Sequence, residues 1–194
     1  MISGLLNNLL ASIGVWVLLT ISDSFLTIQG AKLYGRAARK HFSGSYELET
    51  EHQEDVDAFR VISFKFILDL VLYCGLLWII YSAAYTRVFA FVWGGLFFIQ
   101  IAIHLRHFQN LFVFYYANRS KGIKGQVEYE RKLMLCMSST DLLGIGFLLL
   151  MAFLFTGSLV ILGGAAACGF TAVRHWLMSR KEKFADNVRD SPRL

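Results

Sequence analysis

The sequence predicts an all-α integral membrane protein: a bundle of five transmembrane helices with the N-terminus outside and the C-terminus in the cytoplasm. Hydrophobic residues make up 56% of the 194 positions, and the mean hydropathy is +0.51. A soluble domain of this length cannot cover so much apolar surface, whereas a bilayer removes the need to do so. The positions of the basic residues along the chain predict the orientation.

Long apolar segments divide the chain into spans. A helix needs about 20 apolar residues to cross the hydrocarbon core of a bilayer, and four segments reach that length. The last of them, residues 142–178, is too long for one crossing, and Thr156-Gly157-Ser158 offers a turn that divides it. The predicted membrane domain therefore covers residues 1–178, with spans at about residues 5–29, 61–83, 88–117, 139–155 and 159–178.

The basic residues form three groups, each at the same end of the spans. Sixteen of the 19 Lys and Arg residues belong to them: Lys32, Arg36, Arg39, Lys40 and Arg60; Arg119, Lys121, Lys124, Arg131 and Lys132; and Arg174, Arg180, Lys181, Lys183, Arg189 and Arg193. By the positive-inside rule, five spans bring all three groups to the cytoplasm, whereas four spans would leave the last group outside. Residues 31–60 are thus predicted to be a cytoplasmic loop, and residues 179–194 a basic cytoplasmic tail.

This arrangement also predicts the surroundings of the protein. Basic residues that flank apolar spans favour the anionic headgroups of a lipid bilayer as partners, and not nucleic acid. The predicted location is a plasma or inner membrane.

The 31–60 loop carries two further patterns. Residues 31–42 are basic and helix-compatible, so they are expected to extend the first span along the headgroups. Thr50-Glu51-His52-Gln53 has the form of a capping box, which predicts that the second helix begins in water. The acidic residues between positions 47 and 57 fit a solvated helix start or, alternatively, a docking surface for a basic partner.

Polar residues inside the spans mark the candidate sites, because an ionisable group in lipid needs a partner or a purpose. Five sets occur: Thr20, Asp23, Ser24 and Thr27; Lys65, Asp69 and Tyr73; Gln100, His104, His107 and Asn110, with Arg106 on another side; Ser138, Ser139, Thr140 and Asp141; and Arg174 with His175. With the predicted orientation, all five lie in the cytoplasmic half of the membrane. The outer halves of the spans are almost purely apolar.

Three of these sets have a simple structural interpretation. Lys65 and Asp69 are spaced for an ion pair within one helix. One of residues 139–141 is expected to cap the fourth helix. Arg174 and His175 are expected to anchor the last helix at the headgroups.

Asp23 and the pair His104 and His107 form the main candidate site. Asp23 has no basic residue nearby on its own helix, so its partner must come from another helix. A His–Asp hydrogen bond would hold two helices in register. Alternatively, these residues form a proton or ion relay, or they bind a transition metal. No other cofactor is expected.

The full candidate cluster is Asp23, Thr27, Asp69, His104, His107, Asn110 and Asp141, of which Asp23, His104 and His107 are the candidate metal ligands.

Small residues on the last span predict close helix packing. They are spaced four apart in two pairs: Gly164 with Cys168, and Ala165 with Gly169. Gly144 and Gly146 on the fourth span offer a complementary surface. Homo-oligomerisation through the same face is the alternative.

Four short motifs recur in a known group of proteins: Asp23-x-x-x-Thr27-x-x-Gly30, Ser45-Tyr46-Glu47-Leu48, Leu105-Arg106-His107-x-x-Asn110-Leu111-Phe112 and Arg174-His175-Trp176. With these motifs the chain resembles a family of small multi-pass prokaryotic membrane proteins of unknown function. Members of that family typically follow the Glu-Leu with Asn-Pro, where this chain has Glu49-Thr50. The resemblance implies a multi-pass fold and no particular activity.

The sequence favours a non-enzymatic role, since it contains no catalytic signature. The expected function is that of an accessory subunit of a membrane assembly or a self-associating scaffold, with another membrane protein or a second copy as partner. The alternatives are a transporter or channel for a proton, an ion or a small solute, and a metal-dependent hydrolase that acts on lipid.

Overall fold

The chain folds into five long helices. The computed structural model describes residues 8–36, 42–43, 58, 62–119, 127–128 and 131–181. The helices are α2 (Leu9–Arg36), α4 (Phe64–Ser82), α5 (Thr86–Asn118), α6 (Arg131–Thr156) and α7 (Leu159–Lys181). Each is long and apolar enough to cross a membrane, so the predicted bundle of five membrane-length helices is confirmed. The acidic run, the capping box, residues 45–48 and the tail beyond Lys181 lie outside the described residues.

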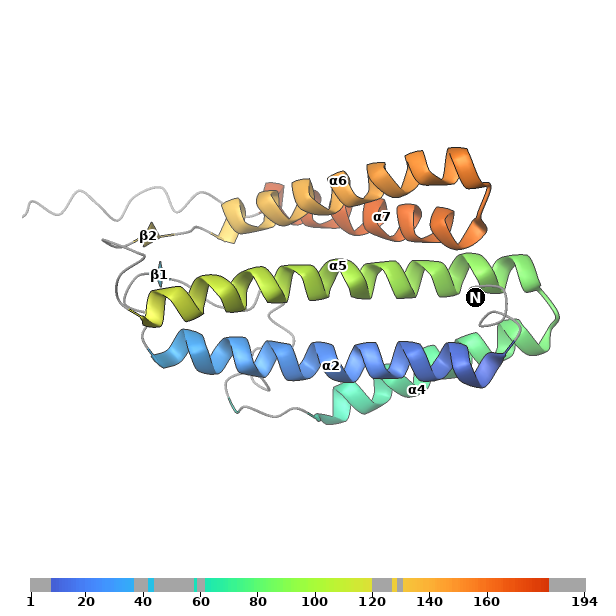
Figure 1. Cartoon of the computed structure of the whole chain (residues 1–194), viewed down its shortest axis with the longest axis horizontal. Helices are drawn as coiled ribbons and strands as arrows, with labels where there is room; N and C mark the ends of the chain where they lie inside the picture. The colour runs from blue at the N-terminus through green and yellow to red at the C-terminus, as the bar shows by residue number, and fades with distance from the viewer. Residues whose placement is uncertain are drawn as a thin grey trace, which may run out of the picture.

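α5 is the central helix of the bundle (Figure 1). It packs against α2 on one side and against α7 on the other, α6 packs against α7, and α4 lies beside α2 and α5. Consecutive helices run in opposite directions, so two ends can be distinguished. We call the end that carries Arg36, Arg119, Arg131 and Lys181 the basic end, and the opposite end, at residues 83–85 and 157–158, the turn end.

A short strand pair, which the sequence did not predict, lies at the basic end. β1 (Phe42–Ser43) pairs in parallel with β2 (Val127–Glu128). It joins the segment after α2 to the segment after α5. The two segments predicted to be cytoplasmic loops therefore meet at one end of the bundle.

Several helix boundaries differ from the expected spans: α2 continues to Arg36, and the starts of α4 and α6 lie at other residues than expected. α4 begins at Phe64, where the Ser63 hydroxyl accepts a hydrogen bond from the Phe66 backbone N–H at 3.2 Å, as an N-cap does. α6 begins at Arg131, so residues 139–141 lie inside the helix and the prediction that one of them caps it was wrong. Thr140 instead donates to the carbonyl oxygen of Cys136 in its own helix.

Glycines allow close contact between α5 and α7. A Cβ atom at Gly163 would collide with the backbone oxygen of Phe91, and one at Gly94 would collide with the backbone of Val160. At Gly164, the ring of Phe98 would lie 2.5 Å from such an atom. The backbones of the two helices therefore touch at positions where any side chain would separate them.

The predicted contact between the last two spans is also present, at three of the four predicted small residues of α7. A Cβ atom at Gly146 of α6 would lie 3.4 Å from atoms of three residues of α7: Ala165, Cys168 and Gly169. Gly164 faces α5 instead, and Gly144 has no atom within 4 Å of a Cβ position. The small residues of α7 thus serve two neighbours, α5 and α6.

The tight turn between α4 and α5 gives the first testable prediction. Ala84 has a φ of 58°, in the left-handed region that costs an L-residue with a Cβ roughly 1 kcal/mol. We expect Ala84→Gly to raise the free energy of unfolding by about 0.5 kcal/mol, measured by thermal unfolding in one detergent. The matched control is Ala83→Gly, because Ala83 has a φ of −77° and gains nothing from glycine. Equal changes in both variants would contradict the interpretation.

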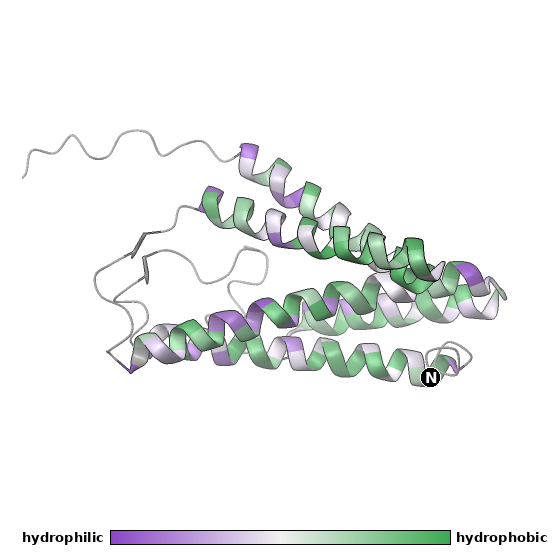
Figure 2. Ribbon diagram, turned by 45° about the horizontal axis from the view of Figure 1, so that its top comes forward, coloured by the Kyte–Doolittle hydropathy of each residue, from purple (hydrophilic) through white to green (hydrophobic). Residues whose placement is uncertain are grey.

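The outer surface of the bundle is apolar over most of its length (Figure 2). The largest exposed fractions of bulky apolar side chains include 90% for Phe155, 81% for Phe64 and 69% for Leu148. Inside, buried residues such as Phe89 and Trp93 fill the turn end, and Leu142 and Cys168 lie further along. An apolar exterior of this kind is what a lipid environment requires.

Candidate functional site

α5 carries polar side chains on two opposite faces. His104 and His107, three residues apart, point toward α2, while Arg106 points toward α6 and α7. Two polar groups result. We call the first the α2–α5 cluster (Ser22, Asp23, Thr27, His104 and His107) and the second the Arg–Ser–His chain (Arg106, Ser138 and His175).

Asp23 finds its partner on another helix, as the sequence required. Its Oδ1 lies 2.8 Å from Nε2 of His107, and the Thr27 hydroxyl lies 3.2 Å from the same nitrogen. The side chains of His107 and Asp23 are only 14% and 23% exposed. Since a carboxylate accepts hydrogen bonds, Nε2 carries the proton that His107 donates to Asp23. This contact joins α2 to α5.

The second ring nitrogen of His107 is left open. Nδ1 is buried, and no residue in the described part of the chain forms a hydrogen bond with it. With Nε2 donating to Asp23, Nδ1 faces no group among the described residues that could bond to it.

Both ring nitrogens of His104 have hydrogen-bond partners. Its Nδ1 lies 2.7 Å from the backbone oxygen of Gln100 and must donate to it. Its Nε2 lies 2.5 Å from the Ser22 hydroxyl, which also lies 2.9 Å from the backbone oxygen of Leu19. His104 thus joins α5 to α2 through Ser22.

The Arg–Ser–His chain joins three helices. The Arg106 guanidinium donates to the Ser138 hydroxyl at 2.9 Å, and that hydroxyl lies 2.9 Å from Nδ1 of His175. Since the Ser138 oxygen accepts from Arg106, its own proton is available to Nδ1. Next to it, Ser139 donates to the backbone oxygen of Ala172 at 2.8 Å, so α6 and α7 are bonded twice at this level.

His175 corrects an expectation from the sequence. It was predicted to anchor the last helix at the headgroups, but its side chain is only 7% exposed and bonds to Ser138. Arg174 is exposed, and the neighbouring Trp176 lies under the Arg180 guanidinium, 4.0 Å from the ring centroid. The anchoring role thus fits the residues around His175, and His175 itself belongs to the interior.

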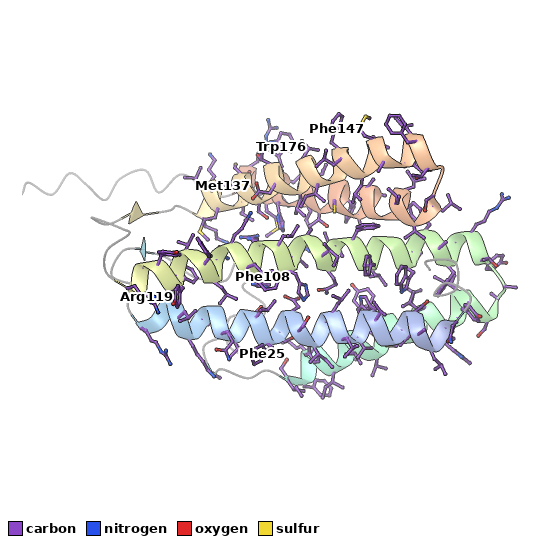
Figure 3. The ribbon with its side chains drawn as sticks, in the orientation of Figure 1. Phe25, Phe108, Arg119, Met137, Phe147 and Trp176 are labelled. Carbon is purple, nitrogen blue, oxygen red and sulfur yellow. The ribbon has the colours of Figure 1, made fainter. Side chains whose placement is uncertain are left out.

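Both polar groups lie at one level of the bundle, where the outer surface is still apolar. Figure 3 labels four side chains that adjoin these groups in sequence and lie at a similar position along its long axis: Phe25, Phe108, Met137 and Trp176. Their exposed fractions are 52%, 57%, 51% and 42%. Polar side chains therefore point inward at a level where the helices expose mainly apolar ones. That is the arrangement expected inside a bilayer.

Helix lengths place this level near one boundary of the hydrocarbon core. The 19 residues of α4 span about 28 Å, close to the thickness of the core. His104 follows the start of α5 by roughly 18 residues, or about 27 Å. α5 continues to Asn118, and beyond His107 it carries the exposed rings of Tyr115 and Tyr116. Aromatic side chains at this position are typical of a membrane interface.

Three residues of the predicted cluster lie elsewhere. Asp69 is exposed on α4, Asp141 is exposed on α6, and Asn110 is half-buried on α5 without a hydrogen bond to any described residue. Within the described ranges, no three His, Cys, Asp or Glu side chains come together in a way that could hold a metal ion. Along the α2–α5 contact, Asp23 lies against His107, and Ser22 lies against His104.

Sequence reasoning missed Ser22 and the Arg–Ser–His chain. A signal for the chain was nevertheless present. In a helical hairpin, residues equally far from the turn face one another, and Ser138 and His175 are about equally far from Gly157 and Ser158. No comparable signal places Arg106 beside them, because residues 119–130 separate α5 from α6 and no tight turn joins the two helices.

The fold and these polar contacts define a class: a multi-pass α-helical membrane protein whose spans are joined by buried polar groups. Comparison with known proteins finds no match for this chain among protein families, curated proteins or solved structures. The resemblance to small prokaryotic membrane proteins of unknown function therefore stays a prediction.

A double-mutant cycle tests the bond between Ser138 and His175. Hydrogen bonds between membrane helices contribute on average about 0.6 kcal/mol and at most about 1.7 kcal/mol. We expect Ser138→Ala and His175→Phe to show a coupling energy of about 1 kcal/mol in SDS-induced unfolding. Thr140→Ala is the matched control, because that hydroxyl bonds within its own helix and should show no coupling to His175→Phe. Coupling of similar size in both cycles would count against the bond.

Proposed function

We propose that this chain is a non-enzymatic multi-pass protein of a prokaryotic plasma or inner membrane, acting as an accessory subunit or a self-associating scaffold. One observation carries the proposal. Several polar groups of the spans bond to one another across helices: Asp23 to His107, Ser22 to His104, and Arg106 through Ser138 to His175. Polar groups used in this way hold helices together, which is a structural role.

The native mass of the protein tests this role. Extraction in a mild detergent or a nanodisc should yield a particle heavier than the 22.0 kDa monomer with its bound lipid or detergent. The same sample in SDS provides the monomer reference. A partner-free monomer in every mild condition would contradict the proposal.

The proposed orientation has the N-terminus outside and the C-terminus in the cytoplasm, with the basic end at the anionic inner headgroups. It is supported by Arg36, Arg119, Arg131 and Lys181, which share one end of the bundle, while Arg87 follows the turn at the other. In a background without native cysteines, a membrane-impermeant maleimide should label Arg87→Cys on intact cells and Lys181→Cys only after lysis. The reverse pattern would invert the orientation.

A second candidate function is proton or ion transport through the α2–α5 cluster. It is supported by the hydrogen bonds that both ring nitrogens of His104 form and by Nδ1 of His107, which has no partner among the described residues. The apolar turn end opposes it, because a path across the bundle would require the helices to move. Proton flux into proteoliposomes should fall in Asp23→Asn and His107→Ala but not in Ser139→Ala. Absence of flux in the wild type, or equal flux in all variants, would remove this candidate.

A further inference from the structure

Asp141 places a carboxylate on the lipid-facing surface of α6. The residue is exposed, and its neighbours along the same face, Met137 and Leu148, are 51% and 69% exposed. It lies about 15 residues, or roughly 22 Å, from the end of α6 at Thr156, which is inside a hydrocarbon core of about 30 Å. A charged side chain at such a position is costly unless it meets a partner.

The described part of the chain supplies no such partner. Within residues 8–36, 62–119 and 131–181, Asp141 forms no hydrogen bond through its side chain and no ion pair. Arg174 is at a similar distance from the α6–α7 turn and is exposed on the adjacent helix, but it does not pair with Asp141. The carboxylate therefore lacks a partner among the described residues and is available to a group that approaches α6 from outside.

The opposite side of the bundle carries a complementary charge. Lys65 is exposed on α4, beside Phe64, which is 81% exposed. It lies about 17 residues, or roughly 26 Å, from the end of α4 at Ser82, and thus at nearly the same level as Asp141. α5 and α2 lie between α4 and α6, so the two charges belong to opposite outer surfaces of one molecule (Figure 1).

We propose that the Asp141 surface of α6 binds the Lys65 surface of α4 in a second copy of this chain. The proposal rests on the proposed self-association and names its interface. α4 and α6 both run from the basic end to the turn end, so in neighbouring copies they lie parallel with the two charges at matching depth. Gly144, exposed one turn from Asp141 with no atom within 4 Å of its Cβ position, leaves room for the approaching helix.

The interface is heterologous, because it joins two different surfaces. Copies related in this way assemble into a closed ring or an open row in the plane of the membrane. Lys65 already takes part in an interaction within its own chain, so Asp141 of the neighbour would share this lysine. The long, flexible side chain of Lys65 suits such sharing.

Charge reversal provides the test, with the mass of the complex in nanodiscs as the measurement. Asp141→Lys and Lys65→Asp should each lower the oligomeric fraction at least tenfold. The double variant should restore it, because the attraction returns with opposite sign. Arg87→Asp, at the exposed start of α5, is the control and should leave the fraction unchanged. If the wild type assembles and the reversals change nothing, this interface is wrong while the proposed function stands. If the wild type is a monomer, both the interface and the proposed self-association are wrong.

Cross-linking gives an answer that does not depend on stability. In a background without Cys74, Cys136 and Cys168, chains with Asp141→Cys and chains with Lys65→Cys are co-expressed and oxidised. A disulfide-linked dimer should form between the two kinds of chain and not within either kind alone. A dimer of Asp141→Cys chains alone would show that α6 meets α6 and would overturn the proposal, as would the absence of any dimer.

Discussion

Gly163→Ala should lower the free energy of unfolding by about 3 kcal/mol, the upper range for overpacked interiors. The added methyl group would meet the backbone oxygen of Phe91 on α5, and a backbone atom cannot rotate aside as a side chain can. α7 must therefore move away from α5 along its length. The measurement is SDS-induced unfolding of the purified protein, followed by circular dichroism.

Gly169→Ala is the matched control on the same helix. A Cβ at Gly169 meets no atom within 4 Å, and alanine favours a helix over glycine by roughly 1 kcal/mol. The two substitutions are chemically identical, yet we expect them to change stability in opposite directions. If both changed stability by the same amount, the contact between α5 and α7 would not be as close as described.

Asp23→Ala should lower the free energy of unfolding by about 1.5 kcal/mol, near the upper limit for hydrogen bonds between membrane helices. Hydrogen bonds to charged groups contribute roughly 1.5–3 kcal/mol, and the substitution removes such a bond from His107, whose side chain is 14% exposed. His107→Leu should have a similar effect, and the double variant should be little worse than either single one. A double-mutant cycle in the same SDS assay measures this coupling.

Asp69→Ala is the control for the Asp23 prediction. Asp69 is exposed on α4, so its loss should leave stability close to that of the wild type. If Asp69→Ala and Asp23→Ala had equal effects, or if the effects of Asp23→Ala and His107→Leu simply added, the pairing of α2 with α5 would be refuted.

The parts of this fold that follow from the sequence depend on local composition or on strict physical necessity. The five helices were predictable because a bilayer imposes an apolar length on each one. The partnership of Asp23 with a histidine was predictable because lipid offers a carboxylate no alternative. The start of α6 was not predictable. Ser138 and Ser139 are residue types that often cap helices, but their partners here, His175 and the backbone of Ala172, belong to α7.

The contacts that the sequence could not predict are mainly those between helices that are distant in sequence. A tight turn forces α6 and α7 together, so their contact could be expected. Nothing local states that α5 also lies against α7, although Gly94 and Gly163 are both required there. His175 was misjudged for the same reason. Its position near the end of a helix indicated a headgroup anchor, while its burial depends on Arg106 and Ser138, which belong to two other helices.

The α6–α7 hairpin meets the rest of the bundle mainly through the contact of α7 with α5. Synthesis runs from the N-terminus, so α2, α4 and α5 enter the bilayer before the hairpin exists. Closing the glycine contact is then the last step of assembly, and a variant blocked there would leave all five helices inserted with the final two detached. Biogenesis of this protein thus has two stages. Insertion depends on the apolar length of each helix, and the docking of α7 onto α5 depends on the glycines at their contact.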